Sequence, residues 1–267
     1  MNIKEKIETS LKIDPDKVRK KIVKFIRNNI EKAGEEGAVI GLSGGLDSST
    51  VSYLCVEAIG EEKVLNVFMP EKNITETESK KDAEKVSEDL DTGLETVQIT
   101  PILEEIKKAI EPWGENKLAV ANIKPRIRMT ILYYYANLHN YLVFGTSNKS
   151  EIKSGYFTKY GDGASDLDPI GDLYKTQVRK IAREIGVPKN IINKPPTAGL
   201  WKGQRDEKEL GLPYKKIDRI YAGLELGLDH SEIAKAINVK QSEVEKFEKK
   251  EKNSKHKLGR PPLPELE

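Results

Sequence analysis

The sequence predicts an α/β fold in which a parallel β-sheet is covered by helices on both faces. Three observations lead to this class. Short apolar runs without polar alternation, which are typical of strands buried on both faces, recur along the first half of the chain. Segments with helical periodicity separate these runs. Polar, glycine-containing turns follow two of the runs directly, as expected where strands of such a sheet lead into helices.

The first 145 residues are expected to hold four strands and the helices between them. After a charged leader, apolar residues at helical spacing from Val18 to Ala33 predict a helix that stops at Gly34. The predicted strands are 38–42, 64–69, 94–99 and 141–145, and the helices between them are 46–59, 75–90, one beginning at Pro101, and 118–140. Pro125 marks either the true start of this last helix or a kink in it.

The second half is expected to alternate long polar loops with helices. Residues 147–173 and 194–211 are rich in glycine, proline and polar side chains, and long loops of this kind usually serve a function. A helix over 173–185 lies between them. Residues 214–267 predict a helical tail with a basic, proline-rich end. Because no clear linker or repeat interrupts the chain, we expect a single domain over residues 1–267.

Composition limits the partners and the compartment of the protein. The 45 basic and 43 acidic side chains nearly cancel to +2, which gives no overall attraction to nucleic acid or to an anionic membrane. The single cysteine, Cys55, cannot form an intrachain disulfide and is expected to be a buried structural thiol. No apolar stretch reaches the roughly 18 residues of a membrane span. We therefore expect a soluble, cytoplasmic protein without nucleic-acid or membrane partners.

A glycine-rich turn joins the first strand to the next helix. Its string Ser43-Gly44-Gly45-Leu46-Asp47-Ser48-Ser49 allows backbone N–H groups to converge on phosphate, and the helix N-terminus adds a positive dipole end. The Gly-Lys-Ser/Thr ending of a Walker A loop is absent. Asp47 would repel phosphate unless a divalent cation lay between them, so it predicts magnesium. The alternative is a plain strand-to-helix turn in which Asp47 caps the helix.

This string resembles the PP-loop of the adenine-nucleotide α-hydrolase superfamily, whose members cleave ATP to AMP and pyrophosphate. Three further motifs follow in order, at residues 145–151, 155–177 and 196–211. Together the four motifs resemble the ammonia-dependent NAD synthetases. The resemblance implies a Rossmann-like three-layer fold and a ligase of NAD biosynthesis. Such an enzyme adenylates the nicotinate carboxylate of deamido-NAD, and ammonia then displaces AMP to give NAD.

The resemblance also implies site residues by their position in the motifs. The ATP-binding positions are Gly41, Leu42, Ser43, Gly44, Gly45, Leu46, Asp47, Ser48, Thr146, Lys175 and Thr197. The deamido-NAD-binding positions are Arg126, Lys159, Asp166, His256 and Lys257. Asp47 and Glu151 match the magnesium ligands. The catalytic positions are Asp47, Lys175 and Asp162, of which Asp162 matches an acid proposed to bind or deprotonate ammonia.

The nitrogen source and the assembly follow from the same resemblance. Residues 1–40, which precede the loop, are too few for an amidase domain with its own cysteine nucleophile. We therefore expect no glutaminase domain, and free ammonia or a separate subunit as the nitrogen donor. The family is typically homodimeric, and the apolar, aromatic segment 131–138 offers an interface.

Two alternatives stay open at this point. Another PP-loop enzyme, such as a tRNA-modifying adenylating enzyme or a GMP synthetase-like amidase, would share the first loop. The non-enzyme alternative is a helix-turn-helix DNA-binding regulator, because residues 229–248 open with a capping-box pattern and suggest two short helices. The second of these helices carries Glu243, Glu245 and Glu248, which would oppose DNA phosphate. A packed helical pair is therefore favoured.

Overall fold

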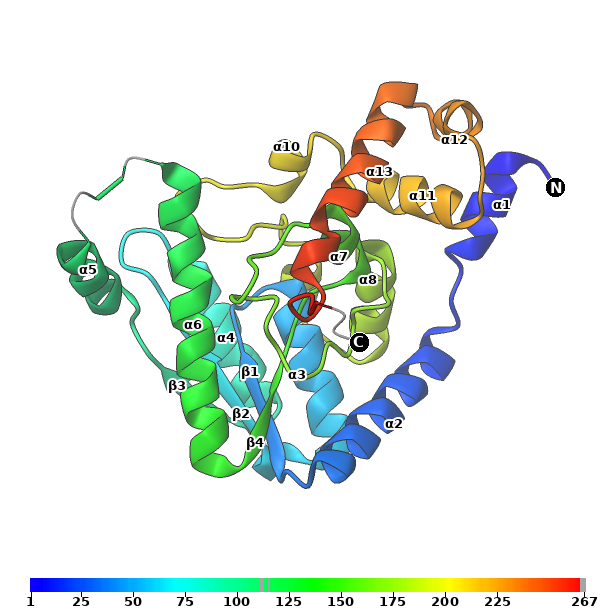
Figure 1. Cartoon of the computed structure of the whole chain (residues 1–267). Helices are drawn as coiled ribbons and strands as arrows, with labels where there is room; N and C mark the ends of the chain where they lie inside the picture. The colour runs from blue at the N-terminus through cyan, green and yellow to red at the C-terminus, as the bar shows by residue number, and fades with distance from the viewer. Residues whose placement is uncertain (111–112, 115, 265–267) are drawn as a thin grey trace.

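The computed structural model describes residues 1–110, 113–114 and 116–264. Within this part of the chain, four strands form one sheet, namely β1 (Gly37–Gly41), β2 (Val64–Phe68), β3 (Gly93–Thr96) and β4 (Tyr141–Phe144). The order is β3-β2-β1-β4, and every neighbouring pair is parallel. The predicted parallel sheet is confirmed, and Figure 1 shows β1 and β2 with helices on either side.

The helices follow the predicted alternation, with additional short elements. They are α1 (Ile3–Ser10), α2 (Pro15–Ala33), α3 (Leu46–Ile59), α4 (Thr77–Asp89), α5 (Thr100–Ala109), α6 (Lys117–His139), α7 (Lys149–Ser154), α8 (Lys175–Glu184), α9 (Lys189–Asn193), α10 (Asp206–Leu210), α11 (Tyr214–Glu225), α12 (His230–Ile237) and α13 (Gln241–Ser254), with 3-10 turns η1 (Glu61–Lys63) and η2 (Lys255–Lys257). No helix among the described residues combines the length and apolar character needed to cross a membrane.

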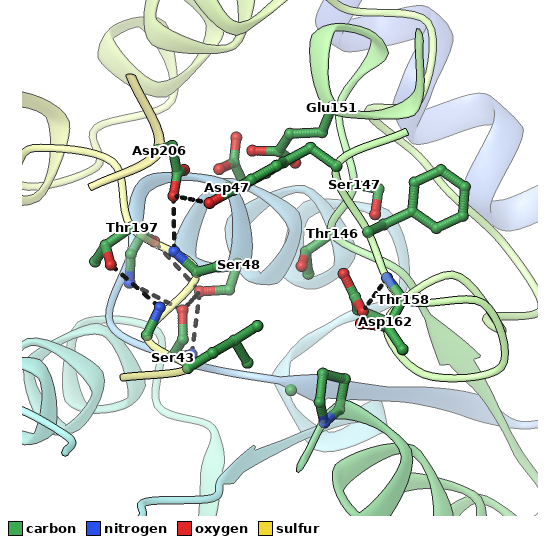
Figure 2. A pocket seen from close by; sticks show the side chains of 18 of the residues that line it. Ser43, Asp47, Ser48, Thr146, Ser147, Glu151, Thr158, Asp162, Thr197 and Asp206 are labelled. Atoms are coloured by element: carbon green, nitrogen blue, oxygen red, sulfur yellow. Dashed lines mark hydrogen bonds between the residues drawn. The ribbon is translucent and has the colours of Figure 1, made fainter. Parts of the chain in front are cut away.

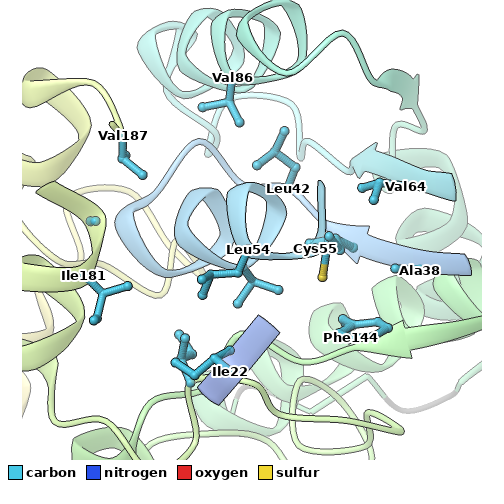
Figure 3. Packing of buried hydrophobic residues seen from close by; sticks show 14 of the residues in the cluster. Ile22, Ala38, Leu42, Leu54, Cys55, Val64, Val86, Phe144, Ile181 and Val187 are labelled. Atoms are coloured by element: carbon cyan, nitrogen blue, oxygen red, sulfur yellow. The ribbon is translucent and has the colours of Figure 1, made fainter. Parts of the chain in front are cut away.

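Successive side chains of β1 and β4 enter two different cores, one on each face of the sheet. Ala38 and Ile40 of β1 belong to the core built with α2, α3 and α8, whereas Val39 belongs to the core built with α5 and α6. Figure 3 shows the first core, where Leu54 and Cys55 of α3 lie among side chains from the sheet and the covering helices. Cys55 is fully buried, as predicted, and burial raises the pKa of its thiol. The sheet is thus the middle of three layers.

A third apolar cluster joins the two ends of the chain. Ile7 of α1 is fully buried in this cluster, together with Tyr221 of α11 and Phe247 of α13. No helix was predicted in the charged leader, but the buried side chain of Ile7 and the capping side chain of Asn2 stabilise a helix there. The tail is helical, as predicted, although residues 265–267 lie outside the described residues. The assignment of the whole chain to one domain stays a prediction.

Helices α12 and α13 form the predicted helical pair. Their apolar side chains, among them Ile233 and Val244, are fully buried in the third cluster. The pair packs against α11, and α12 also contacts α1. This packing supports the interpretation of the pair as a structural part of the molecule.

The long helix α6 starts earlier than the proline suggested. It begins at Lys117, where the side chain of Asn116 accepts two backbone N–H groups of the first turn. Pro125 lies inside the helix, so its interpretation as the helix start was wrong. The missing N–H of a proline removes only one hydrogen bond of the helix.

Short helices interrupt both predicted loops. The segment 147–173 contains α7, and the segment 194–211 contains α10. Helices of five or six residues complete fewer than two turns, so they leave no periodic apolar pattern to recognise. Both short helices lie close to the site described next.

Candidate active site

Two of the predicted motifs meet at the carboxyl edge of the sheet. The glycine-rich loop, residues 42–45, leads from β1 into α3, and residues 145–148 lead from β4 into α7. These two strands are neighbours in the sheet, while the chain from β1 continues to β2 on the other side. A ligand site is expected where the direction of the chain reverses in this way. A cavity of about 780 Å³ opens there (Figure 2).

The glycine-rich loop is held in a conformation that suits an anion. The Ser48 hydroxyl accepts the backbone N–H of Ser43 at 3.1 Å and lies 3.0 Å from the Ser43 hydroxyl. Gly44 has a φ of +71°, and a Cβ at this position would lie 2.3 Å from the carbonyl oxygen of Ser79 in α4. Only glycine fits this close approach without movement of α4. The loop therefore presents polar groups around the N-terminus of α3, where phosphate binds favourably.

Three charged side chains converge beside this loop. Lys175, the first residue of α8, places its Nζ 2.5 Å from Asp47 Oδ2 and 3.0 Å from Glu151 Oε1. The side chains of Lys175, Asp47 and Glu151 are only 4%, 17% and 15% exposed. Asn148 joins the two acids, because its amide donates to Asp47 and its side-chain oxygen accepts the backbone N–H of Glu151. The structure thus brings together the three residues that the motifs place in separate segments.

Burial and charge alter the protonation of this cluster. Burial raises the pKa of Glu151, and the nearby Lys175 opposes this effect. Burial lowers the pKa of Lys175, but the carboxylates of Asp47 and Glu151 outweigh burial and raise it above its usual value. Lys175 is therefore a cation that is held between two acids.

Asp162 and Arg126 lie further along the same cavity. The Asp162 carboxylate accepts the backbone N–H of Thr158 at 2.9 Å. Burial raises the pKa of Asp162, while the hydrogen bond from Thr158 lowers it. Arg126 of α6 donates from Nε to the backbone carbonyl of Lys159 at 3.2 Å. This bond holds the guanidinium of Arg126 against the segment that carries Lys159, and both residues line the cavity.

The cavity collects most of the predicted site residues. The members that line it are Gly41, Leu42, Ser43, Gly45, Leu46, Asp47, Ser48, Arg126, Thr146, Glu151, Lys159, Asp162, Lys175, Thr197, His256 and Lys257. Lys257 also donates to the backbone carbonyls of Gly155 and Phe157. The tail thus reaches the site, although it follows the first motif by some two hundred residues.

Asp166 has a different position from the one expected of a ligand-binding residue. The described residues that line the cavity do not include it. Its carboxylate accepts the backbone N–H of Val143 at 2.8 Å and the hydroxyl of Tyr133 at 2.9 Å. These two hydrogen bonds tie the segment that carries Asp166 to β4 and α6. The role of Asp166 as a contact for deamido-NAD stays a prediction.

The comparison with known proteins agrees with this geometry. Residues 18–261 match the family model described as NAD synthase. The chain belongs to the NAD synthase family. An NH(3)-dependent NAD(+) synthetase of Methanocaldococcus jannaschii is 48% identical over 253 residues, which cover 94% of this chain and 97% of that protein.

Two solved structures resemble this member of the NAD synthase family along almost its whole length. One is an NMN synthetase from Francisella tularensis, with a TM-score of 0.85, 32% identity, and coverage of 96% of this chain and 100% of that chain. The other is an NH3-dependent NAD synthetase from Campylobacter jejuni, in complex with a nitrate ion, with a TM-score of 0.79, 31% identity, and coverage of 95% and 100%.

The acids of this NAD synthase family member fit a magnesium ion that arrives with a nucleotide. Magnesium keeps several waters and is usually held by one or two carboxylates together with substrate phosphates. Asp47 and Glu151 direct two carboxylates to the same point beside the phosphate loop. Residues 1–110, 113–114 and 116–264 contain no group of three His, Cys, Asp or Glu side chains that could hold a metal ion alone. The donor set therefore suits a metal that the substrate helps to bind.

Sequence reasoning assigned no role to two buried polar residues of the site, Asn148 and Asp206. Asn148 could have been found, because Asn-x-x-Glu ahead of a helix is a capping-box pattern. Asp206 accepts the backbone N–H of Ala198 at 2.9 Å and the hydroxyl of Tyr156 at 3.2 Å, and it is 3% exposed. It thereby fixes the loop that carries Thr197. No sequence pattern predicts the contact with Tyr156, which lies 50 positions away.

Proposed function

We propose that this chain is an ammonia-dependent NAD synthetase that amidates deamido-NAD and converts ATP to AMP and pyrophosphate. The observation that carries the proposal is the meeting of Asp47, Glu151 and Lys175 beside a phosphate-type loop, in a cavity that also holds Asp162. Membership of the NAD synthase family and the high identity to an NH(3)-dependent NAD(+) synthetase support it.

The proposed reaction has two steps. A carboxylate oxygen of nicotinate attacks the α-phosphorus of ATP, and the bond to pyrophosphate breaks. Ammonia then attacks the activated carboxyl carbon, AMP leaves, and the nitrogen gives up a proton. The phosphate loop and Lys175 stabilise the charge on the departing pyrophosphate. Asp162, which lines the same cavity, binds the ammonia or accepts its proton.

We further propose that Asp47 and Glu151 hold magnesium when ATP is bound. The ion would neutralise charge on the phosphates as a Lewis acid. Lys175 now pairs with the same two carboxylates that would bind the ion. When magnesium binds, Lys175 would therefore release at least one of them and turn towards the phosphates. Thr146 and Thr197 line the cavity and offer hydroxyl groups to ATP.

Basic residues at the rim suit the second substrate. Arg126, Lys159, His256 and Lys257 come from three separate segments and line one cavity. A dinucleotide carries a pyrophosphate, and an arginine can bind two of its oxygens at once. We propose these four residues as contacts for deamido-NAD.

The likeness to an NMN synthetase favours a second candidate, in which the same amidation acts on the nicotinate mononucleotide. The test supplies ATP, magnesium and ammonium with each acid substrate separately. Deamido-NAD should yield NAD, AMP and pyrophosphate, with kcat/KM roughly tenfold or more above that for the mononucleotide. The reverse preference would support the second candidate. Formation of ADP and phosphate, or no turnover with either acid, would contradict both.

The remaining alternatives are tested in parallel. Xanthosine monophosphate and tRNA replace the acid substrate in the same assay, and turnover with either one alone would favour another PP-loop enzyme. An electrophoretic shift assay at moderate salt tests the regulator hypothesis. Specific binding to a DNA duplex would support it, whereas weak, salt-sensitive binding would not.

We also propose that the protein is a homodimer. Tyr134 and Leu138 of α6 are 62% and 59% exposed, which is unusual for large apolar side chains close together on one helix. Sedimentation equilibrium of the wild type and of Tyr134→Lys tests this face. A monomeric wild type would contradict the proposal. The cytoplasmic location also stays a proposal, and cell fractionation tests it.

A further inference from the structure

Asp218 is a carboxylate with no exposed surface that lies outside the cavity, on the tail helix α11. Its Oδ1 accepts the hydroxyl of Ser150 at 2.6 Å. Its Oδ2 accepts both the backbone N–H and the hydroxyl of Thr176, at 2.9 and 2.6 Å. A buried carboxylate is costly unless donors satisfy its oxygens, and here three donors do so.

Each partner of Asp218 is a sequence neighbour of a residue in the charged cluster. Ser150 directly precedes Glu151, and Thr176 directly follows Lys175. In addition, the Ser150 hydroxyl accepts the backbone N–H of Lys175 at 2.9 Å. One carboxylate therefore fixes the backbone from which both the lysine and the glutamate extend.

The contacts of Asp218 and Ser150 also supply acceptors for the first backbone N–H groups of α8. The first N–H groups of a helix have no partner within the helix, and a negative charge near them is favourable. In α8 the N–H of Lys175 is satisfied by Ser150 and that of Thr176 by Asp218. An asparagine could not replace Asp218 fully, because its amide nitrogen cannot accept a hydrogen bond.

The same helix supplies a second contact with the cluster. Tyr214 lies one turn before Asp218 on α11, and its hydroxyl is 3.5 Å from Glu151 Oε1. The ammonium group of Lys175 lies 5.1 Å from the centre of the Tyr214 ring. Two side chains of α11, four residues apart, thus support the cluster.

We propose that Asp218 is a positioning residue, which places Lys175 and Glu151 for the phosphates of ATP through Ser150 and Thr176. The inference rests on the proposed function, since it assumes that Lys175 contacts ATP. It assigns the tail helix α11 a role in the site as well as in the fold. A flexible lysine binds phosphate well only if its backbone is held, because a displacement of about 1 Å can cost roughly a hundredfold in rate.

The test is a double-mutant cycle on equilibrium ATP binding, measured by calorimetry in the presence of magnesium. The four proteins are the wild type, Asp218→Asn, Lys175→Met and the double variant. We expect Asp218→Asn to weaken ATP binding roughly tenfold. In the Lys175→Met background the same change should have little further effect, because the group that Asp218 positions is gone.

The outcomes separate the inference from the proposed function. If Asp218→Asn weakens binding by the same factor in both backgrounds, or does not weaken it in the wild-type background, the positioning role is overturned while the role of Lys175 stands. If Lys175→Met binds ATP as tightly as the wild type, the proposed role of Lys175 fails and the inference fails with it.

Two further variants test whether the effect of Asp218→Asn is only a loss of structure. Asp14 caps the N-terminus of α2, where its side chain accepts the backbone N–H of Lys17. Asp14→Asn therefore changes another aspartate at a helix N-terminus, and it should leave ATP affinity unchanged. If Asp218→Asn does not fold, Ser150→Ala replaces it in the cycle, because this change removes only the link from Asp218 to the N–H of Lys175. Wild-type ATP affinity in Ser150→Ala would then overturn the inference.

Discussion

Lys175 and Asp47 are 128 positions apart in the sequence, yet the Lys175 ammonium lies 2.5 Å from the Asp47 carboxylate at the edge of the cavity. The lysine begins α8, and the aspartate lies in the first turn of α3. Their ion pair places a cation and an anion beside the loop that suits phosphate. The proposed magnesium and Lys175 share the same two carboxylates, and the following predictions test this arrangement.

Asp47→Asn should lower kcat/KM for ATP about a hundredfold, because the amide removes the charge that holds the metal but keeps the size of the side chain. Circular dichroism should show an unchanged fold. Asp172→Asn is the matched control, since that side chain is 98% exposed and should tolerate the change. Wild-type kinetics of Asp47→Asn at saturating magnesium would contradict the metal role.

Lys175→Met should leave Asp47 and Glu151 without their shared cation. Breaking a buried ion pair on one side costs about 3 kcal/mol of unfolding free energy. The loss should grow as the pH rises through the raised pKa of Glu151, about 7, and should shrink in acid, because protonation of Glu151 neutralises one of the two charges that the lysine no longer balances. Urea unfolding with and without magnesium measures the effect, and magnesium alone should restore part of the stability. An unchanged unfolding free energy at neutral pH would contradict this account.

Magnesium binding should tighten as the pH rises. Metal binds the deprotonated carboxylate, and burial raises the pKa of Glu151 above the usual glutamate value. Affinity is therefore lost as the pH falls through this raised pKa, and it is fully present above it. The magnesium concentration that gives half the maximal rate, followed from acid to weakly alkaline pH, measures the effect. Glu151→Gln should weaken binding and remove this dependence, and an unchanged pH profile in that variant would assign the titration to another group.

Gly44→Ala should raise the KM for ATP, and the increase should be larger than the one caused by an alanine at another position with a similar positive φ. The added Cβ would lie 2.3 Å from the Ser79 carbonyl, so either the loop or α4 must move. Gly34→Ala is the control, because Gly34 has a similar φ of +72° but nothing within 4 Å of the added atom. It should cost only about 1 kcal/mol of stability and leave the KM for ATP unchanged. Equal effects of the two variants on ATP binding would argue against the close packing of the loop.

Asp162→Asn should separate the two chemical steps. If Asp162 binds ammonia or accepts its proton, the variant should lose roughly a hundredfold in kcat/KM for ammonia. Adenylation does not involve ammonia, so a burst of pyrophosphate in its absence should keep the wild-type rate. Rapid-quench assays of the two steps measure this. Equal losses in both steps would place Asp162 in ATP binding or in the fold.

Local patterns were sufficient to predict much of the fold. The four apolar runs were confirmed as parallel strands, and the helix that stops at Gly34 was confirmed. These features depend on residues that are close in the sequence, where periodicity and capping are visible. The helical N-terminus was missed, because Ile7 is stabilised by the tail and not by its neighbours. Helices α7 and α10 were missed because they are too short to show a period.

The sequence by itself determined the glycine-rich loop, the acid within it and the order of the motifs, because each is a string of adjacent residues. Only the tertiary structure decided which distant groups meet at the site. It joined Lys175 to Asp47 and Glu151, hydrogen-bonded Asp166 to Val143 of β4, and hydrogen-bonded Asp218 to Ser150 beside Glu151. These contacts connect residues that are 23 to 128 positions apart. No local preference encodes them, since they form only when the sheet and the tail helices pack together.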